Sequence, residues 1–341
     1  MTTLSDRLSQ PVQDSSAWYG PQMLQRDDWI VRLSPPELAE LDKATAAVRA
    51  KGLSPLEVTR EDFLLPTLAP KIDNWVEELE NGRGFQLIKG IPVERYDQDT
   101  LATLYWGIGT HLGQMISQNA KGELLARVED TGADFAAKNA RGYRTNAGLH
   151  PHNDSADLVG LLCVRQALEG GLSSFTSSMT IFNEILQQRP DLLPPLWRGF
   201  HYDVRGEGVT ADPNEVTRHP VPVFSYYGGR LSCRFNARAI RTGAEKMGSG
   251  LSGLDAEAVE MVERLSTDPR LRLDMALEPG DLQILNNHMT IHMRSAFRDT
   301  PEHKRLLLRL WVNLWNGRPL APEFANRYNT GAREGVARGA G

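Results

Sequence analysis

The pattern of apolar and polar positions divides the chain into a helical first part and a strand-rich second part. Apolar residues recur at helical spacing between Leu38 and Val48, and again within 68–80 and 97–112. The motif Ser34-Pro35-Pro36-Glu37 supplies an N-cap followed by proline at the first helical position. The pattern therefore predicts three helices, the first of which ends near Lys51.

Beyond about residue 120, short apolar runs alternate with turn residues. The run Leu158–Val164 is apolar throughout, which is typical of a strand buried on both faces. Gly228-Gly229 and Glu278-Pro279-Gly280 each separate two strand-like runs and predict hairpins over 220–235 and 271–285. Helices followed by many antiparallel strands predict a mostly β fold, a barrel or jelly roll with flanking helices.

No internal repeat or clean linker divides the chain. We expect an N-terminal helical segment over 1–84 that packs on the barrel, and a barrel domain with inserted helices over 85–316. Residues 317–341 are rich in Gly, Arg and Ala and are predicted to form a loosely held tail.

The stretch 149–154 brings two imidazoles and a carboxylate close together. His150, His152 and Asp154 occupy alternate positions, so an extended strand would place them on one face. The best distant third ligand is His292. Two histidines and one carboxylate leave open coordination positions, as in non-haem iron(II) oxygenases, whereas a structural zinc site closes with four ligands and favours cysteine.

The last predicted strand, 305–315, carries a basic face. Arg305, Leu307, Arg309 and Trp311 alternate with Leu306, Leu308 and Leu310. Two arginines inside a barrel are costly unless an anion pairs with them, and a guanidinium can grip a carboxylate with two hydrogen bonds. In the alternative arrangement, the leucine face lines the interior and the arginines pair with acids on the surface.

Composition narrows the class of function. The 38 basic and 43 acidic residues give a net charge of −5, which offers no reason to expect nucleic-acid or membrane binding. The two cysteines lie in apolar or strand-like runs and are expected to be buried thiols, and no signal pattern begins the chain. We therefore expect a cytoplasmic protein that acts on a small molecule. The sequence is also compatible with a homo-oligomer.

Several motifs together resemble the taurine dioxygenase-like branch of the iron(II)/2-oxoglutarate-dependent dioxygenases. They occur in a fixed order from about Phe85 to about Trp315. They are His152-Asn153-Asp154, Gly170-Gly171-Leu172-Ser173, Pro279-Gly280-Asp281, Asn286-Asn287, His292-Met293-Arg294, Arg305 and Arg309. The resemblance implies a double-stranded β-helix, the cupin-like jelly roll, with Fe(II), 2-oxoglutarate and O2 as cofactors.

The resemblance also implies roles for individual residues. His152, Asp154 and His292 would be the iron ligands. Arg305, 13 residues after His292, would bind the distal carboxylate of 2-oxoglutarate, with a hydroxyl from Ser173. The substrate contacts suggested by position are Arg309, Tyr143, Asn146 and His150. The family often has another residue where this chain has Pro151, which leaves the role of His150 open.

The implied reaction releases succinate and CO2 and oxidises an unactivated C–H bond of a small substrate. If Arg309 faces inward, it favours a substrate that is anionic or amino-acid-like. Hydroxylation is the usual outcome, and some relatives desaturate or cyclise instead. A rival interpretation is a cupin-like hydrolase or isomerase that uses zinc or manganese with His150, His152 and His292. A second rival is a binding protein that kept the fold without catalysis.

Overall fold

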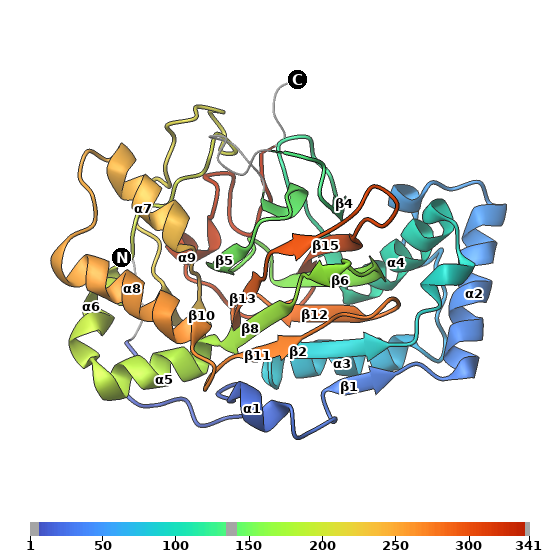
Figure 1. Cartoon of the computed structure of the whole chain (residues 1–341), viewed down its shortest axis with the longest axis horizontal. Coiled ribbons are helices and arrows are strands. Elements are labelled where there is room, and N and C mark those ends of the chain that lie inside the picture. Colours follow the sequence, from blue (N-terminus) through green and yellow to red (C-terminus); the bar gives the residue numbers. More distant parts are fainter. Residues whose placement is uncertain (1–6, 134–141, 338–341) are drawn as a thin grey trace.

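Two β-sheets face each other across an apolar core (Figure 1). The computed structural model describes residues 7–133 and 142–337. The larger sheet contains, in spatial order, β1 (Ile30–Arg32), β2 (Phe85–Lys89), β12 (Leu282–Asn286), β6 (Leu158–Arg165), β15 (Leu306–Leu314) and β3 (Gly113–Met115), with β4 (Leu125–Val128) also paired to β15. The smaller sheet contains β11 (Leu273–Met275), β8 (Ser173–Ser177), β13 (Thr290–Arg294) and β5 (Leu149–His152).

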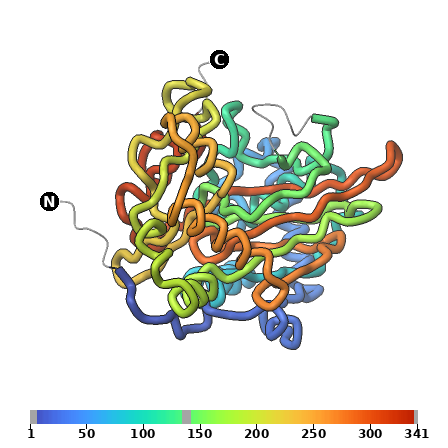
Figure 2. Tube along the Cα trace, turned by 60° about the vertical axis from the view of Figure 1, so that its left-hand side comes forward, coloured from blue at the N-terminus to red at the C-terminus, as the bar shows by residue number. Residues whose placement is uncertain are grey.

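Strands that are distant in sequence pair along both sheets. β15 lies antiparallel to β6, with Arg309 opposite Leu161, and Figure 2 shows this red strand beside the green one. β13 lies between β8 and β5, with His292 opposite both Phe175 and His152. β1 pairs with β2 in parallel, which draws the N-terminal segment into the larger sheet.

Three helices cover the outer face of the larger sheet: α2 (Pro35–Ala50), α3 (Ala69–Asn81) and α4 (Gln98–Leu112). The helices begin where the sequence predicts. Ser34 and Glu37 form a capping box at the start of α2, and the Asp97 side chain accepts a hydrogen bond from the Thr100 N–H at the start of α4.

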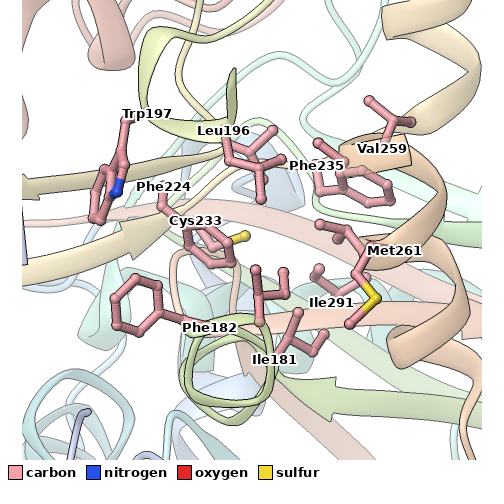
Figure 3. Close-up of a cluster of buried hydrophobic side chains, with 14 of the residues drawn as sticks. Ile181, Phe182, Leu196, Trp197, Phe224, Cys233, Phe235, Val259, Met261 and Ile291 are labelled. Atoms are coloured by element: carbon pink, nitrogen blue, oxygen red, sulfur yellow. The ribbon is translucent and has the colours of Figure 1, made fainter. Parts of the chain in front are cut away.

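A second group of elements packs on the outer face of the smaller sheet. It consists of α5 (Ser178–Gln188), α6 (Leu193–Arg198), α7 (Ala237–Lys246), α8 (Gly253–Thr267) and the hairpin of β9 (Phe224–Tyr227) and β10 (Arg230–Cys233). Figure 3 shows their common core, in which Phe182, Leu196 and Phe224 meet Ile291 of β13. This core makes the strand that carries His292 a rigid support. The short elements that remain are α1 (Gly20–Met23), α9 (Pro322–Ala325), β7 (Glu169–Gly170) and β14 (Phe297–Arg298).

The last strand shows which face is interior. Leu308 and Leu310 pack with the helices outside the larger sheet, while Leu307 and Trp311 join Phe85 and Phe175 between the sheets. Arg305 and Arg309 share the inner face and are 4% and 7% exposed. The prediction of inward arginines is therefore confirmed, and the leucine face packs against helices instead.

Two predictions about the chain are wrong. The runs over 271–285 do not form a hairpin, because β11 pairs with β8 in the smaller sheet and β12 pairs with β2 and β6 in the larger one. The chain crosses between the sheets at the Pro-Gly turn. The described part of the tail is also packed rather than loose: Arg318, Phe324 and Arg327 are buried. Residues 338–341 lie outside the described residues.

Candidate active site

Three side chains meet near the edge of the smaller sheet that β5 forms. His152 ends β5, Asp154 follows it by two residues, and His292 lies directly opposite His152 on β13. Nε2 of His152 is 3.9 Å from Oδ1 of Asp154, and Nε2 of His292 is 3.7 Å from Oδ2. All three potential ligand atoms lie within 4.8 Å of one another. One metal ion can contact all three from this arrangement.

The protonation states suit metal binding. Burial lowers the pKa of His152, and burial lowers the pKa of His292 to about 3, so both imidazoles are neutral. Burial alone would raise the pKa of Asp154, but Arg309 and the two histidines outweigh it and lower the pKa. Nδ1 of His152 lies 2.8 Å from the His150 carbonyl, which can only accept, so Nδ1 carries the proton and Nε2 keeps its lone pair.

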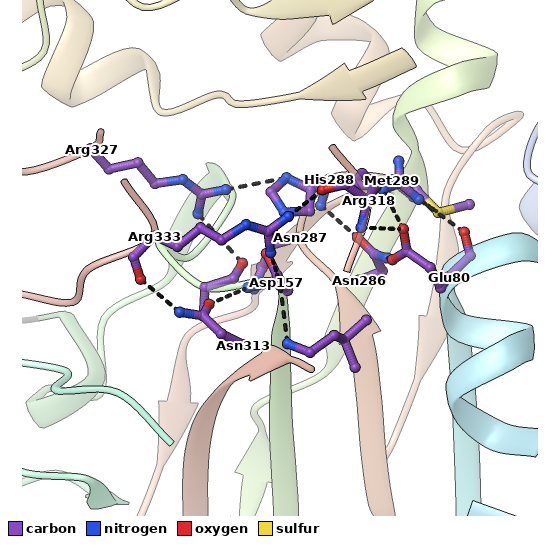
Figure 4. A network of polar contacts seen from close by, with 12 residues as sticks. Glu80, Asp157, Asn286, Asn287, His288, Met289, Asn313, Arg318, Arg327 and Arg333 are labelled. Carbon is purple, nitrogen blue, oxygen red and sulfur yellow. Dashed lines mark hydrogen bonds and ion pairs between the residues drawn. The ribbon is translucent and has the colours of Figure 1, made fainter. Parts of the chain in front are cut away.

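The loop that carries Asp154 is fixed through its backbone. The Asp154 N–H donates to Oδ1 of Asn287 over 3.0 Å, and Nη1 of Arg327 donates to the Asp154 carbonyl over 2.7 Å. Arg327 also donates through Nη2 to Nδ1 of His288, whose Nε2 lies 2.9 Å from Asp157 (Figure 4). The Asp154 carboxylate is thereby oriented without using its own oxygens.

A narrow cavity of about 50 Å³ joins the three side chains to Arg305 and Ser173. Nη1 of Arg305 is buried and has no hydrogen-bond partner, and burial lowers its pKa to about 10, so the guanidinium stays charged. The Ser173 hydroxyl donates to Oε1 of Gln283 over 2.8 Å. The cavity therefore holds a buried guanidinium with an unpartnered donor beside the three potential metal ligands, which suits an acid that also reaches the metal.

Sequence reasoning gave no role to Arg294, which lines the same cavity. Its guanidinium lies 4.7 Å from the centre of the Phe297 ring, and that of Arg305 lies 5.1 Å from it. Nη2 of Arg294 donates to the carbonyls of Thr145 and Ala147, whereas Nε and Nη1 are buried without partners. Burial, and then the charge of Arg305, lower the pKa of Arg294 to about 9. Arg294 shares the face of β13 with His292, which was the available signal.

Three of the four predicted substrate contacts line a second cavity beside the metal site. A larger cavity of about 290 Å³ is lined by Tyr143, His150 and Arg309 together with His152 and Asp154. Tyr143, His152, Asp154 and Arg309 line both cavities, so the metal-facing atoms lie where the two meet. His150 is exposed and is absent from the group of ligands, which argues against the zinc site built on His150.

Arg309 is held in place by its neighbours. Its Nε donates to Oε1 of Gln118 over 2.7 Å, its guanidinium lies over the Tyr143 ring at 4.5 Å, and Nη1 is 3.9 Å from Asp154. Asn146 is different, because it is exposed and lines neither cavity. Its backbone carbonyl accepts from the Phe297 N–H over 3.0 Å. The position of Asn146 does not support its predicted contact with substrate.

Comparison with known proteins identifies the family. Residues 49–311 match the model of the taurine catabolism dioxygenase TauD, TfdA family. The chain belongs to this family. It is a non-haem iron(II) dioxygenase that uses 2-oxoglutarate and O2, as the resemblance in the sequence implied. The TauD/TfdA chain is 32% identical over 317 residues to the FR-33289 synthase of Streptomyces rubellomurinus, which covers 91% of this chain and 93% of that protein.

Two further similarities concern the same region of the TauD/TfdA fold. A taurine hydroxylase-like protein of Stachybotrys chartarum is 28% identical over 319 residues, covering 89% of this chain and 80% of that protein. A crystal structure of asparagine oxygenase with Fe(II), hydroxyasparagine and succinate has a TM-score of 0.67 at 17% identity and covers 84% of this chain and 93% of its own. The predicted jelly roll is thus confirmed. Within 7–133 and 142–337, no helix combines the length and apolar character needed to cross a bilayer.

Proposed function

We propose that His152, Asp154 and His292 hold the iron(II), and that Arg305, assisted by Ser173, binds the distal carboxylate of 2-oxoglutarate. The observation that carries this proposal is the junction of the two cavities at His152 and Asp154. One cavity contains the unpaired Arg305 and suits the co-substrate, and the other leaves room for a substrate. The donor set fits iron(II), since two neutral imidazoles and one carboxylate leave positions open.

Each residue has a defined task in this assignment. Bound iron(II), with 2-oxoglutarate and O2, supplies the oxidising power for an unactivated C–H bond. Asp154 contributes negative charge and the two histidines contribute neutral nitrogen donors. Arg305 neutralises the far end of the co-substrate, and Ser173 turns its hydroxyl from Gln283 toward the same carboxylate. Val159, Leu161 and Leu307 line the narrow cavity and exclude water.

The substrate in this proposal is a small anionic or amino-acid-like molecule. It binds in the larger cavity, in contact with Tyr143, His150 and Arg309. The fixed guanidinium of Arg309 beside Asp154 supports an anionic substrate, as does the relation to a taurine hydroxylase-like protein, since taurine is an aminosulfonate. The cytoplasmic location and a homo-oligomeric state stay predictions.

The test is a panel of amino acids and small anions read by succinate formation above the level without substrate. We expect a positive substrate to need both iron(II) and 2-oxoglutarate, and we expect Arg309→Gln to raise its KM about tenfold or more, the loss of one charged hydrogen bond. Asn146→Ala is the control and should change neither the KM for the substrate nor kcat. Turnover with zinc or manganese in the absence of 2-oxoglutarate would instead support the hydrolase or isomerase.

A further inference from the structure

The larger cavity contains basic side chains that the proposed function does not use. Among its described lining residues are five basic side chains, Arg205, Arg234, Arg238, Lys246 and Arg309, against two carboxylates, Asp154 and Asp203. Asp154 is assigned to the metal, and Asp203 accepts from Nζ of Lys246 over 2.6 Å. The walls of this cavity therefore carry an excess of positive charge.

Arg234 is the most buried of these groups outside the metal site, since it is only 7% exposed. Nη2 donates to the Arg327 carbonyl over 3.0 Å, and the guanidinium lies 4.6 Å from the centre of the Tyr202 ring. Nη1 is buried and has no hydrogen-bond partner. A buried guanidinium with a spare donor and no carboxylate beside it is costly without a ligand.

Arg205 adds a second charge to the same region. Both arginines line the larger cavity. Burial is the main reason that the pKa of Arg234 is lowered, and the charge of Arg205 lowers it slightly further. Burial opposes the charge of Arg205 as well, but Tyr328, Glu207 and Asp203 outweigh burial and raise its pKa. Nε of Arg205 is buried without a partner. Neither Arg205 nor Arg234 forms an ion pair within the described residues. Two guanidiniums are thus held close together despite their repulsion.

We propose that Arg205 and Arg234 bind a phosphoryl group of the substrate, as a phosphonate or phosphate monoester, in the cavity that opens on the metal site. This inference rests on the proposed function, because it concerns the substrate of that site. Two adjacent cations are compensated by a dianion better than by one carboxylate, and a tetrahedral group offers three oxygens to two guanidiniums. Tyr202 and Tyr328 line the same cavity.

The test measures binding of methylphosphonate, methyl phosphate and acetate to the enzyme loaded with iron(II) and 2-oxoglutarate, without oxygen, by calorimetry. We expect both phosphoryl probes to bind more tightly than acetate. Arg205→Gln and Arg234→Gln should each weaken them at least about tenfold, the effect of losing a charged hydrogen bond. Arg241→Gln is the matched control, because Arg241 lies on α7 but contacts Glu263. It should leave the dissociation constants unchanged.

Preference between the two probes tells the phosphonate from the ester. Arg234→Lys keeps the charge and should retain part of the affinity, so it decides the matter if the glutamine variant is unstable. Equal binding of acetate and phosphoryl probes, undetectable phosphoryl binding, or no loss in both glutamine variants would each overturn the inference. The charge-transfer absorption of bound 2-oxoglutarate is followed in the same samples. If it is absent, the proposed function fails first, and if it is present without phosphoryl binding, only this inference fails.

Discussion

His288 and His292 lie four residues apart, and both side chains are buried. Burial lowers the pKa of each to about 3, and both face the interior. Their partners differ. His288 uses both ring nitrogens, one with Asp157 at 2.9 Å and one with Arg327 at 3.2 Å. Nδ1 of His292 has no partner, and its Nε2 points at Asp154 without a hydrogen bond.

This difference shows which feature separates a structural histidine from a candidate ligand. A low pKa reports only that the charged form is disfavoured, which is true of both residues. Nε2 of His292 faces Asp154 at 3.7 Å, is not used in a hydrogen bond, and is therefore the ring nitrogen that a metal can bind. The two regions therefore have different purposes: the His288 network holds the loop, and the His292 region is left open to a metal.

The largest expected effect is at Asp154. The His288 network holds the loop of Asp154 through Arg327, and His292 faces the Asp154 carboxylate. Asp154→Ala should abolish iron binding. Removing a residue that only supports a metal ligand typically lowers activity by roughly 10- to 100-fold, and we expect turnover to fall by more than this when the ligand itself is removed. The fold should persist, because Asp154 is fixed through its backbone. Iron titration and succinate release measure the loss, and thermal melting checks the fold. Normal activity in this variant would remove Asp154 from the site.

Exchanging the two histidines separates their roles. His292→Ala should lose iron, whereas His288→Ala should keep a full equivalent of iron but lower the free energy of unfolding by about 2–4 kcal/mol, since it leaves a cavity and two unpaired partners. Iron content and chemical denaturation of the metal-free proteins are the measurements. Loss of iron in both variants, with similar stabilities, would mean that the distinction is unsound.

Arg305 extends the open region to the co-substrate. Arg305→Gln should raise the 2-oxoglutarate concentration needed for half-maximal rate by about 10- to 100-fold, because a buried charged hydrogen bond is lost. Arg298→Gln is the control, since Arg298 is exposed and pairs with Glu169. Succinate formation measured at a series of 2-oxoglutarate concentrations gives the half-maximal concentration and the maximal rate for each variant. An unchanged requirement would assign the co-substrate to another cation, with Arg294 the next candidate.

The smallest expected effect is a pH dependence that belongs to His288. Its pKa is about 3 in the folded protein and near 6.5 when unfolded, so the unfolded state binds the proton first and stability falls as pH decreases through this window. Between about pH 7.5 and about pH 6, one such histidine costs roughly 0.8 kcal/mol. Denaturation of the metal-free protein at both pH values should show this part of the loss disappear in His288→Ala. An identical loss in that variant would contradict the pKa shift.

The sequence predicts the fold where a pattern is local. The alternation of Arg305, Leu307 and Arg309 identifies the inner face of β15, because a strand has period two and the leucines needed helices to pack on. The strand pairing around 271–285 is not predicted correctly, because a Pro-Gly turn indicates a reversal of direction but not whether the chain changes sheet. Pairing is decided by contacts with β2, β6 and β8 that are distant in sequence.

The candidate site divides in the same way. His152, Asp154, His292 and Arg305 occur at recognisable spacings, so the sequence indicates them, and the structure brings them around two joined cavities. Gln283 and Arg327 carry no such spacing, and Arg294 is indicated only by its place two residues after His292. Arg327 lies in the segment predicted to be loose because glycine and arginine there resemble a flexible tail, yet the guanidinium finds buried carbonyl acceptors.

Arg327 follows the last sheet strand by more than ten residues and reaches back to the carbonyl of Asp154. The loop of Asp154 therefore depends on a segment that belongs to neither sheet. A proteolytic cut between Leu314 and Arg327 would leave every strand in place and still release the Asp154 carbonyl from this guanidinium.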